Sequence, residues 1–262
     1  MFLGLGNTVG YHRLLTHKSF KTSPFVQACL VLPGALHSGS PLFWVGLHRL
    51  HHTKSDSDED PHSPIHGFWW AHTGWLVGSH SRAVAIALAL SGFGQQLIIV
   101  RHDLLRILGR NPPEWLQICA DLRNDPLLRL LDIPGVMPLV FAAQVFLSFW
   151  LGGVTGLILL WAVHFWVTNL SWSVNSVCHS ERFGVQRFDT GEGSRDVAFL
   201  ALITAGESYH NGHHRNPRSA RHAPEGGVDP SWWLIRGLVA LGLASEPRLP
   251  GVRRGQGREP PG

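Results

Sequence analysis

One uncharged segment constrains the fold of this chain more than any other feature. From Ile133 to Ser180 the sequence has no Asp, Glu, Lys or Arg, a run of 48 residues. A membrane-spanning helix needs about 20 mostly apolar residues, so this run is too long for one span and suits two. Gly152 and Gly153 lie near its middle and favour a tight turn. The sequence therefore predicts a transmembrane hairpin over about 134–174.

Arginines flank both ends of this predicted hairpin. Arg123 and Arg129 precede it, Arg182 and Arg187 follow it, and the central turn carries no charge. Basic residues concentrate on the cytoplasmic side of membrane proteins. We therefore expect both ends of the hairpin on the cytoplasmic face.

The composition agrees with extensive lipid contact and excludes several classes of site. Charged residues make up only 15% of the chain, against about a quarter in soluble domains. The net charge of +4 comes without a Lys/Arg-rich run, so we expect no nucleic-acid partner. The three cysteines form no CxxC pair, which argues against iron–sulfur, structural zinc and c-type haem sites.

Two further apolar stretches, 22–47 and 83–100, are broken by glycine, proline or glutamine. If all the histidine clusters of the chain form one site, the number of membrane crossings between them must be even. The hairpin alone satisfies this condition, so we expect both stretches to lie at the interface without spanning.

The expected fold class is therefore all-α, an integral membrane helical protein with a histidine-rich cytosolic cap that holds a di-metal site. One membrane domain is expected over 1–246, with the cap built from 7–132 and 175–246. Residues 247–262 are rich in Gly, Pro and Arg and are expected to form a disordered tail.

Histidine is the outlier of the composition, with 17 residues. Nine of them fall in three clusters and one isolated position: His12, His17, His48, His51, His52, His179, His210, His213 and His214. Imidazole suits zinc, copper, iron and nickel. Nine imidazoles are too many for one ion and suit two.

The spacing within the clusters predicts which imidazoles share an ion. Positions i, i+3 and i+4 lie on one face of an α-helix, so His48, His51 and His52 are expected to point at one metal. His12 and His17 are five residues apart, roughly 140° on an α-helix. We therefore expect these two to serve neighbouring ions.

Other metal chemistries find less support. The HExxH motif of zinc hydrolases is absent. Soluble di-iron proteins use Glu-x-x-His with further helical glutamates; Glu59–His62 and Glu207–His210 match the string, but the further glutamates are not evident and Pro61 disfavours a helix. His37, His80, His102 and His222 are interpreted as ordinary surface or core histidines.

Four motifs together resemble a known family. They are HRLLTH at 12–17, HRLHH at 48–52 followed by Asp60-Pro61-His62, NSVCH at 175–179, and GESYHNGHH at 206–214. In order and spacing they resemble the membrane fatty-acid desaturases of the stearoyl-CoA desaturase type, with bacterial acyl-CoA and acyl-lipid members most similar. The resemblance covers roughly 5–80 and 120–245. Members usually carry a transmembrane hairpin before the first motif, so the chain is expected to be N-terminally truncated.

The resemblance implies roles for individual residues. The nine histidines above would ligate two irons, and Asn175 would hold one iron through a water. Asp60, Asp196 and Glu207 are candidates for carboxylates that orient the imidazoles. His62 and His72 would be local hydrogen-bonding groups. The basic residues expected near an anionic headgroup are Arg13, Lys18 and Lys21.

The resemblance also implies an activity. An oxygen-dependent desaturase would introduce a double bond into a saturated acyl chain linked to CoA, lipid or carrier protein. Electrons would come from a separate donor such as ferredoxin or a haem protein, and the location would be a bacterial inner membrane. Three alternatives stay open: a membrane di-iron lipid hydroxylase or monooxygenase, a non-catalytic membrane metal-binding or transport protein, and an inactive fragment.

Overall fold

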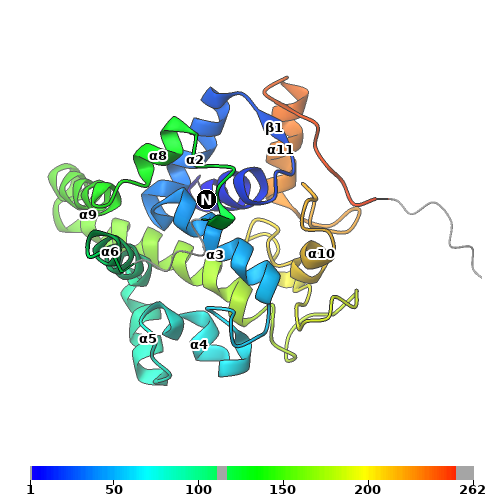
Figure 1. Ribbon diagram of the computed structural model, residues 1–262, viewed down its shortest axis with the longest axis horizontal. Helices are drawn as coiled ribbons and strands as arrows, with labels where there is room; N and C mark the ends of the chain where they lie inside the picture. The colour runs from blue at the N-terminus through cyan, green and yellow to red at the C-terminus, as the bar shows by residue number, and fades with distance from the viewer. Residues whose placement is uncertain (1, 111–116, 252–262) are drawn as a thin grey trace, which may run out of the picture.

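A computed structural model describes residues 2–110 and 117–251 of the chain. The described part is mostly helical, in agreement with the expected class (Figure 1). Its first half contains α1 (Phe2–Leu5), η1 (Gly6–Thr16), β1 (Lys21–Thr22), α2 (Pro24–Ser38), α3 (Pro41–Lys54), η2 (Pro64–His66), α4 (Phe68–His72), η3 (Gly74–Leu76), α5 (Arg82–Ser91) and α6 (Gly94–Ile107). Its second half contains α8 (Pro126–Leu131), α9 (Val136–Ser176), η4 (Ala198–Leu200), α10 (His210–Arg215), α11 (Pro230–Ala240) and β2 (Ala244–Ser245). The two short strands pair antiparallel.

Four helices begin with the same local signal, a polar residue followed by proline. The side chain at the N-cap accepts a hydrogen bond from the backbone N–H three residues later, and proline occupies the first helical position, where no N–H is needed. The pairs are Ser23-Pro24, Ser40-Pro41, Asp125-Pro126 and Asp229-Pro230. These signals fix the start of α3, which carries the second histidine cluster.

Helix α9 is the candidate membrane span. Among residues 2–110 and 117–251 it alone is long and apolar enough by itself to cross a membrane. Gly153 within it has φ 55° and ψ −139°, which bends the chain at the expected turn. A Cβ on Gly156 would lie 1.9 Å from the carbonyl oxygen of Ser148, so the helix after the bend packs back against the helix before it.

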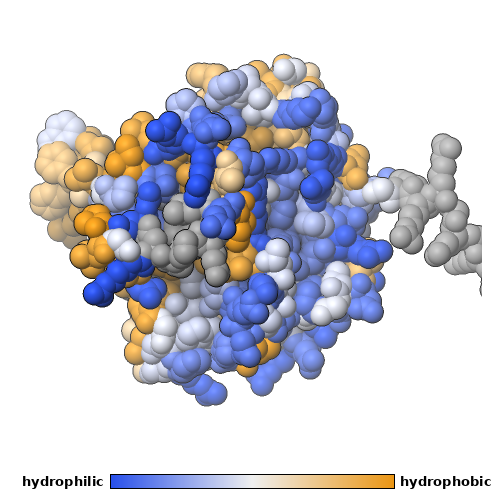
Figure 2. Space-filling model, viewed as in Figure 1, coloured by the Kyte–Doolittle hydropathy of each residue, from blue (hydrophilic) through white to orange (hydrophobic). Residues whose placement is uncertain are grey.

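The surface reflects this arrangement. Large apolar side chains of α9, such as Trp150 and Leu151, are exposed. Figure 2 shows apolar residues gathered over the side of the molecule that carries α9, and hydrophilic residues over the side that carries α10. In Figure 1 the second half of α9 runs from the apolar side back toward α10. It thereby connects an apolar surface to the histidine-bearing part of the chain.

The two other apolar stretches each form a sharply bent pair of helices. Helices α2 and α3 meet at 82°, and α5 and α6 meet at 101°. Each pair is apolar enough to be a broken span or a re-entrant loop by length and composition. The expectation that neither stretch spans stays a prediction.

The main core surrounds η1, and glycines allow that close packing. A Cβ on Gly6 would lie 2.2 Å from Gly34 N, and one on Gly10 would lie 2.3 Å from Leu30 O. Helices η1 and α2 therefore pack backbone against backbone, which fixes the position of the first histidine cluster. Of the expected disordered tail, residues 252–262 lie outside the described residues.

Candidate metal centre

The first histidine pair is carried by a π-helix, η1. A π-helix forms hydrogen bonds between residues five apart, and the His17 backbone N–H donates to the His12 carbonyl oxygen at 3.1 Å. Residues five apart then share one face. His12 and His17 consequently lie in one group, which corrects the α-helical expectation that they serve different ions.

The nine histidines converge in two groups. In each group the candidate ligand nitrogens lie within 4.8 Å of one another. The larger group contains His12, His17, His48, His52 and His213. The smaller contains His51, His179, His210 and His214. The groups adjoin, because the rings of His52 and His214 stack with centroids 4.5 Å apart.

The two HxxHH motifs divide between the groups in a reciprocal way. On α3, His48 and His52 face the larger group while His51 faces the smaller. On α10, His210 and His214 face the smaller group while His213 faces the larger. Residues i and i+4 are about 40° apart on a helix, whereas adjacent residues are about 100° apart. The expectation that His48, His51 and His52 point at one metal is therefore wrong.

Short nitrogen–nitrogen distances show how closely these imidazoles converge. The Nε2 atoms of His12 and His213 are 3.1 Å apart, those of His52 and His213 are 2.9 Å apart, and those of His210 and His214 are 3.1 Å apart. Ligands around a metal with bonds of about 2.1 Å have neighbouring atoms roughly 3 Å apart. The spacing fits nitrogens that share an ion.

The environment also favours the ligating form of imidazole. Burial, with neighbouring histidines adding to it, holds the pKa of six of them well below the usual value: His17, His48, His52, His210, His213 and His214. Neutral imidazole is the metal-binding form. Among the described residues, the buried Nε2 atoms of His17, His51 and His179 have no hydrogen-bond partner. Buried polar atoms need a partner, and a metal would supply it here.

Two of the three expected carboxylates contact an imidazole of the site. Asp60 Oδ2 accepts a hydrogen bond from His51 Nδ1 at 2.9 Å. Glu207 pairs with His12 Nδ1 and with Arg13. Because a carboxylate only accepts, Nδ1 carries the proton in both imidazoles, and Nε2 keeps its lone pair. Burial acts to raise the pKa of Glu207, yet the interactions with neighbouring His12 and Arg13 hold that pKa below its usual value.

The third carboxylate, Asp196, supports the backbone instead. Its Oδ1 accepts a hydrogen bond from Gly212 N at 3.0 Å, and Arg187 pairs with its other oxygen. These contacts hold the first turn of α10. The expectation that Asp196 orients an imidazole directly is corrected to a role in positioning the helix.

The expected headgroup contacts need a similar correction. Arg13 is fully buried and paired with Glu207 and Asp229, so its guanidinium cannot meet a headgroup. Lys18 and Lys21 are exposed, and each pairs with a carboxylate, Asp121 or Glu246. For these two lysines, contact with a headgroup stays a prediction.

Sequence reasoning missed three residues beside the centre. Asp56 Oδ1 lies 2.9 Å from His179 Nδ1, and Glu192 Oε1 lies 3.5 Å from His214 Nδ1. His222, interpreted as an ordinary histidine, packs its ring 4.4 Å from that of His213. The acidic stretch that follows α3 in the sequence could have indicated Asp56. Glu192 and His222 lie in loops, and no sequence pattern indicated them.

His72 agrees with its expected hydrogen-bonding role, whereas the buried Nδ1 of His62 has no hydrogen-bond partner among the described residues. His62 Nδ1 lies 3.2 Å from Asp60 Oδ1. His72 contacts Ser176 Oγ at 2.9 Å and Asn169 Oδ1 at 3.2 Å, which joins α4 to the end of α9.

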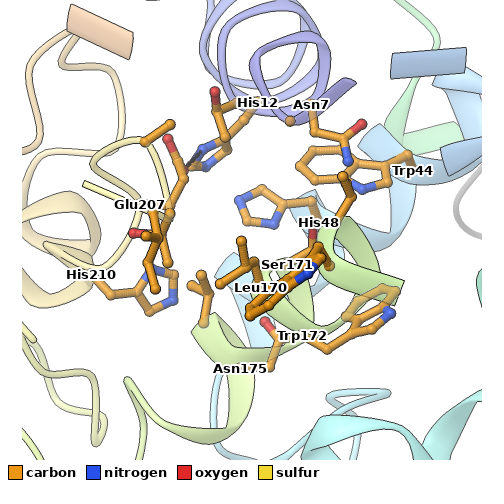
Figure 3. Close-up of a pocket in the computed structure, with 18 of the residues that line it drawn as sticks. Asn7, His12, Trp44, His48, Leu170, Ser171, Trp172, Asn175, Glu207 and His210 are labelled. Carbon is orange, nitrogen blue, oxygen red and sulfur yellow. Dashed lines mark ion pairs between the residues drawn. The ribbon is translucent and has the colours of Figure 1, made fainter. Parts of the chain in front are cut away.

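A cavity of about 500 Å³ opens beside both groups (Figure 3). His12 and His48 of the larger group and His210 of the smaller line it. Asn175 and Trp172 line it from α9. Further apolar lining comes from Trp44, Leu47, Trp166, Val167, Leu170, Leu202 and Ile203. An elongated apolar ligand in this cavity would lie against the imidazoles.

Comparison with known proteins identifies the family. The fatty acid desaturase family matches residues 1–223. The sn-1 stearoyl-lipid 9-desaturase of Anabaena variabilis is 36% identical, over 94% of this chain and 79% of that protein. An acyl-CoA 5-desaturase of Anemone leveillei is 36% identical, over 94% of this chain and 68% of that protein. The sn-2 palmitoyl-lipid 9-desaturase of a Nostoc species is 34% identical, over 94% and 77%. The chain therefore belongs to the fatty acid desaturase family and is an oxidoreductase that desaturates fatty acyl chains.

Proposed function

We propose that the nine histidines hold two iron ions, one in the five-histidine group and one in the four-histidine group, and that oxygen is the co-substrate. The observation that carries the proposal is the convergence of those nine imidazoles, from η1 and the residue after it, α3, α10 and the segment after α9, into two adjoining groups. Asn175, which lines the cavity with His210, would add a water-held contact on the four-histidine side. When bound, the irons supply the oxygen chemistry that removes hydrogen from two adjacent methylenes.

The protein's own contribution is to hold His12 and His51 in one tautomer and one ring orientation. Asp60 and Glu207 accept the Nδ1 protons of His51 and His12, which directs both Nε2 atoms toward the centre. Such partners fix the ring orientation and raise ligand basicity. The same contacts remove the rotational freedom that would otherwise oppose metal binding.

The cavity is proposed to hold the acyl chain. Its lining is mainly apolar and includes exposed Leu202, Ile203 and Trp166 as well as buried Trp172. An acyl chain that enters past the exposed residues would place a short stretch of methylenes beside His12, His48 and His210. Holding one carbon pair at the metals converts a flexible chain into a positioned reactant.

The membrane arrangement follows from α9. We infer that its two halves form a transmembrane hairpin with both ends on the cytoplasmic side of an inner membrane. The site would then lie just beyond the bilayer, because Asn175 is near the end of α9 and His179 follows it. In this arrangement the chain over 1–246 is one membrane domain with a cytosolic cap.

The substrate class and electron source are also inferred. Relatives are named for lipid-linked and for CoA-linked acyl groups, so we propose a fatty acyl substrate carried by one of these. Electrons would come from a separate donor, such as ferredoxin or a haem protein.

Expression in a host that lacks unsaturated fatty acids tests the function. Fatty-acid profiling should reveal a new alkene, and the variant His51→Ala should abolish it. A new alcohol would instead indicate a lipid hydroxylase. Bound metal without any altered fatty acid would favour the non-catalytic alternatives.

A further inference from the structure

The four-histidine group is bordered by more carboxylates than its sequence motifs suggest. Asp60 contacts His51, Asp56 contacts His179, and Glu192 lies within 3.5 Å of His214 Nδ1 and 3.7 Å of His179 Nδ1. Among the described residues, the imidazole–carboxylate contact of the five-histidine group is that of His12 with Glu207. Arg13 also pairs with Glu207 and neutralises the charge of this carboxylate. The two groups therefore have different electrostatic surroundings.

Asp56 occupies a junction between three segments of the chain. Asp56 lies just after α3, and its Oδ1 is 2.9 Å from Nδ1 of His179, which follows α9. Its Oδ2 accepts a hydrogen bond from Gly193 N at 2.5 Å. Its own backbone N–H donates to Asp60 Oδ2 at 3.3 Å. Asp56 has φ 58°, a left-handed conformation that Asp and Asn tolerate better than most residues. The backbone is thus held in an uncommon conformation that turns this carboxylate toward His179.

Glu192 is fixed by its own loop. Its Oε2 accepts a hydrogen bond from Ser194 N at 2.8 Å, and its Oε1 accepts one from Ser194 Oγ at 2.5 Å. Asn211 on α10 donates to Ser194 Oγ at 3.3 Å, which joins this loop to the helix that carries His210 and His214. The carboxylate is therefore held between His179 and His214 by contacts that do not involve either imidazole.

We propose that Asp56 and Glu192 are positioning residues that orient His179 and His214 and strengthen metal binding selectively at the four-histidine group. This inference rests on the proposed function, since it needs both groups to bind metal. A carboxylate beside the Nδ1 of a ligand fixes the ring and raises its basicity, and loss of such a partner costs about 10- to 100-fold in metal affinity. Because these carboxylates contact imidazoles of one group, removing either carboxylate should weaken the binding of one of the two metal ions.

The variants Asp56→Asn and Glu192→Gln test this proposal. Asn tolerates the left-handed conformation at position 56, so Asp56→Asn removes charge while keeping shape. The matched controls are Asp58→Asn, whose side chain is 87% exposed in the same segment, and Glu181→Gln, which is exposed after α9. The full-length protein in detergent is titrated with Co²⁺, and both the d–d absorption bands and the metal bound per chain under chelator competition are followed.

The wild-type protein and both controls should bind two equivalents of Co²⁺. In Asp56→Asn and Glu192→Gln one equivalent should weaken about 10- to 100-fold with altered bands, and the other should be unchanged. Unchanged affinity at both equivalents would overturn the proposal. Equal weakening of both, together with a lower melting temperature, would show a merely structural role and also overturn it. If the wild-type protein binds no Co²⁺, the proposed function itself fails.

Discussion

His17 donates its backbone N–H to the carbonyl oxygen of His12 across a π-helical turn, and the two imidazoles meet in one group. This relationship depends on η1 lying directly on α2. A Cβ at Gly10 would come within 2.3 Å of Leu30 O, whereas a Cβ at Gly4 would meet nothing within 4 Å.

Gly10→Ala should therefore separate η1 from α2. We expect a loss of about 1–3 kcal/mol in stability, the usual cost of forcing an extra group into a packed interface, and weaker metal binding by the five-histidine group. Thermal unfolding and metal content check this, with Gly4→Ala as the control. Equal melting temperatures for the two variants would contradict the packing described here.

The buried Arg13 offers a second test. Arg13→Met leaves Glu207 and Asp229 without their shared cation inside the protein, and breaking a buried ion pair costs about 3–5 kcal/mol. Lys18→Met, at an exposed pair, should change stability by no more than about 1 kcal/mol. Melting temperatures distinguish the two variants, and a mild effect of Arg13→Met on stability together with a raised KM would restore Arg13 as a headgroup contact.

Acid should destabilise the metal-free protein. Six of the nine histidines have a pKa well below the usual value in the folded state, mainly because of burial, whereas in the unfolded chain they titrate near about 6.5. Below that pH the unfolded state binds more protons, so stability is greatest above it and falls as the pH drops toward the folded-state pKa values. Melting of the metal-stripped protein at a series of pH values checks the sign. A melting temperature that does not fall on acidification would show that these imidazoles are not buried.

The sequence predicted the convergence of the nine imidazoles but not their division into two groups. The charge-free run and its glycine pair indicated the bent helix α9, because charges are excluded from lipid whatever the details of packing. Histidine spacing indicated which imidazoles converge. It could not assign them to groups, since ideal α-helical geometry fails at η1, where packing of Gly6 and Gly10 on α2 accompanies the π-helix.

Other features depend on tertiary structure that no local pattern encodes. From its place in the first histidine motif, Arg13 was expected to face solvent. Instead it forms buried ion pairs with Glu207 and Asp229, which lie about 200 residues later in the sequence. Asp56 meets His179 only because the chain after α3 and the chain after α9 come together. Neither contact has a sequence spacing that could reveal it.

Removal of single histidines should separate the two metal positions. His17→Ala and His179→Ala should each lower bound metal toward one equivalent, because each removes a ligand from a different group. Both should reduce desaturation by more than about 100-fold. His80→Ala, at an exposed histidine outside both groups, is the control. A full complement of metal in His17→Ala or His179→Ala would contradict the assignment.

The most direct test of the central claim is the iron content of the purified full-length protein together with its Mössbauer spectrum. We expect two irons per chain in two different nitrogen-rich environments, both removed by a chelator, and activity restored when iron is returned. One iron per chain, or two irons in a single symmetrical environment, would contradict the division of nine histidines into groups of five and four.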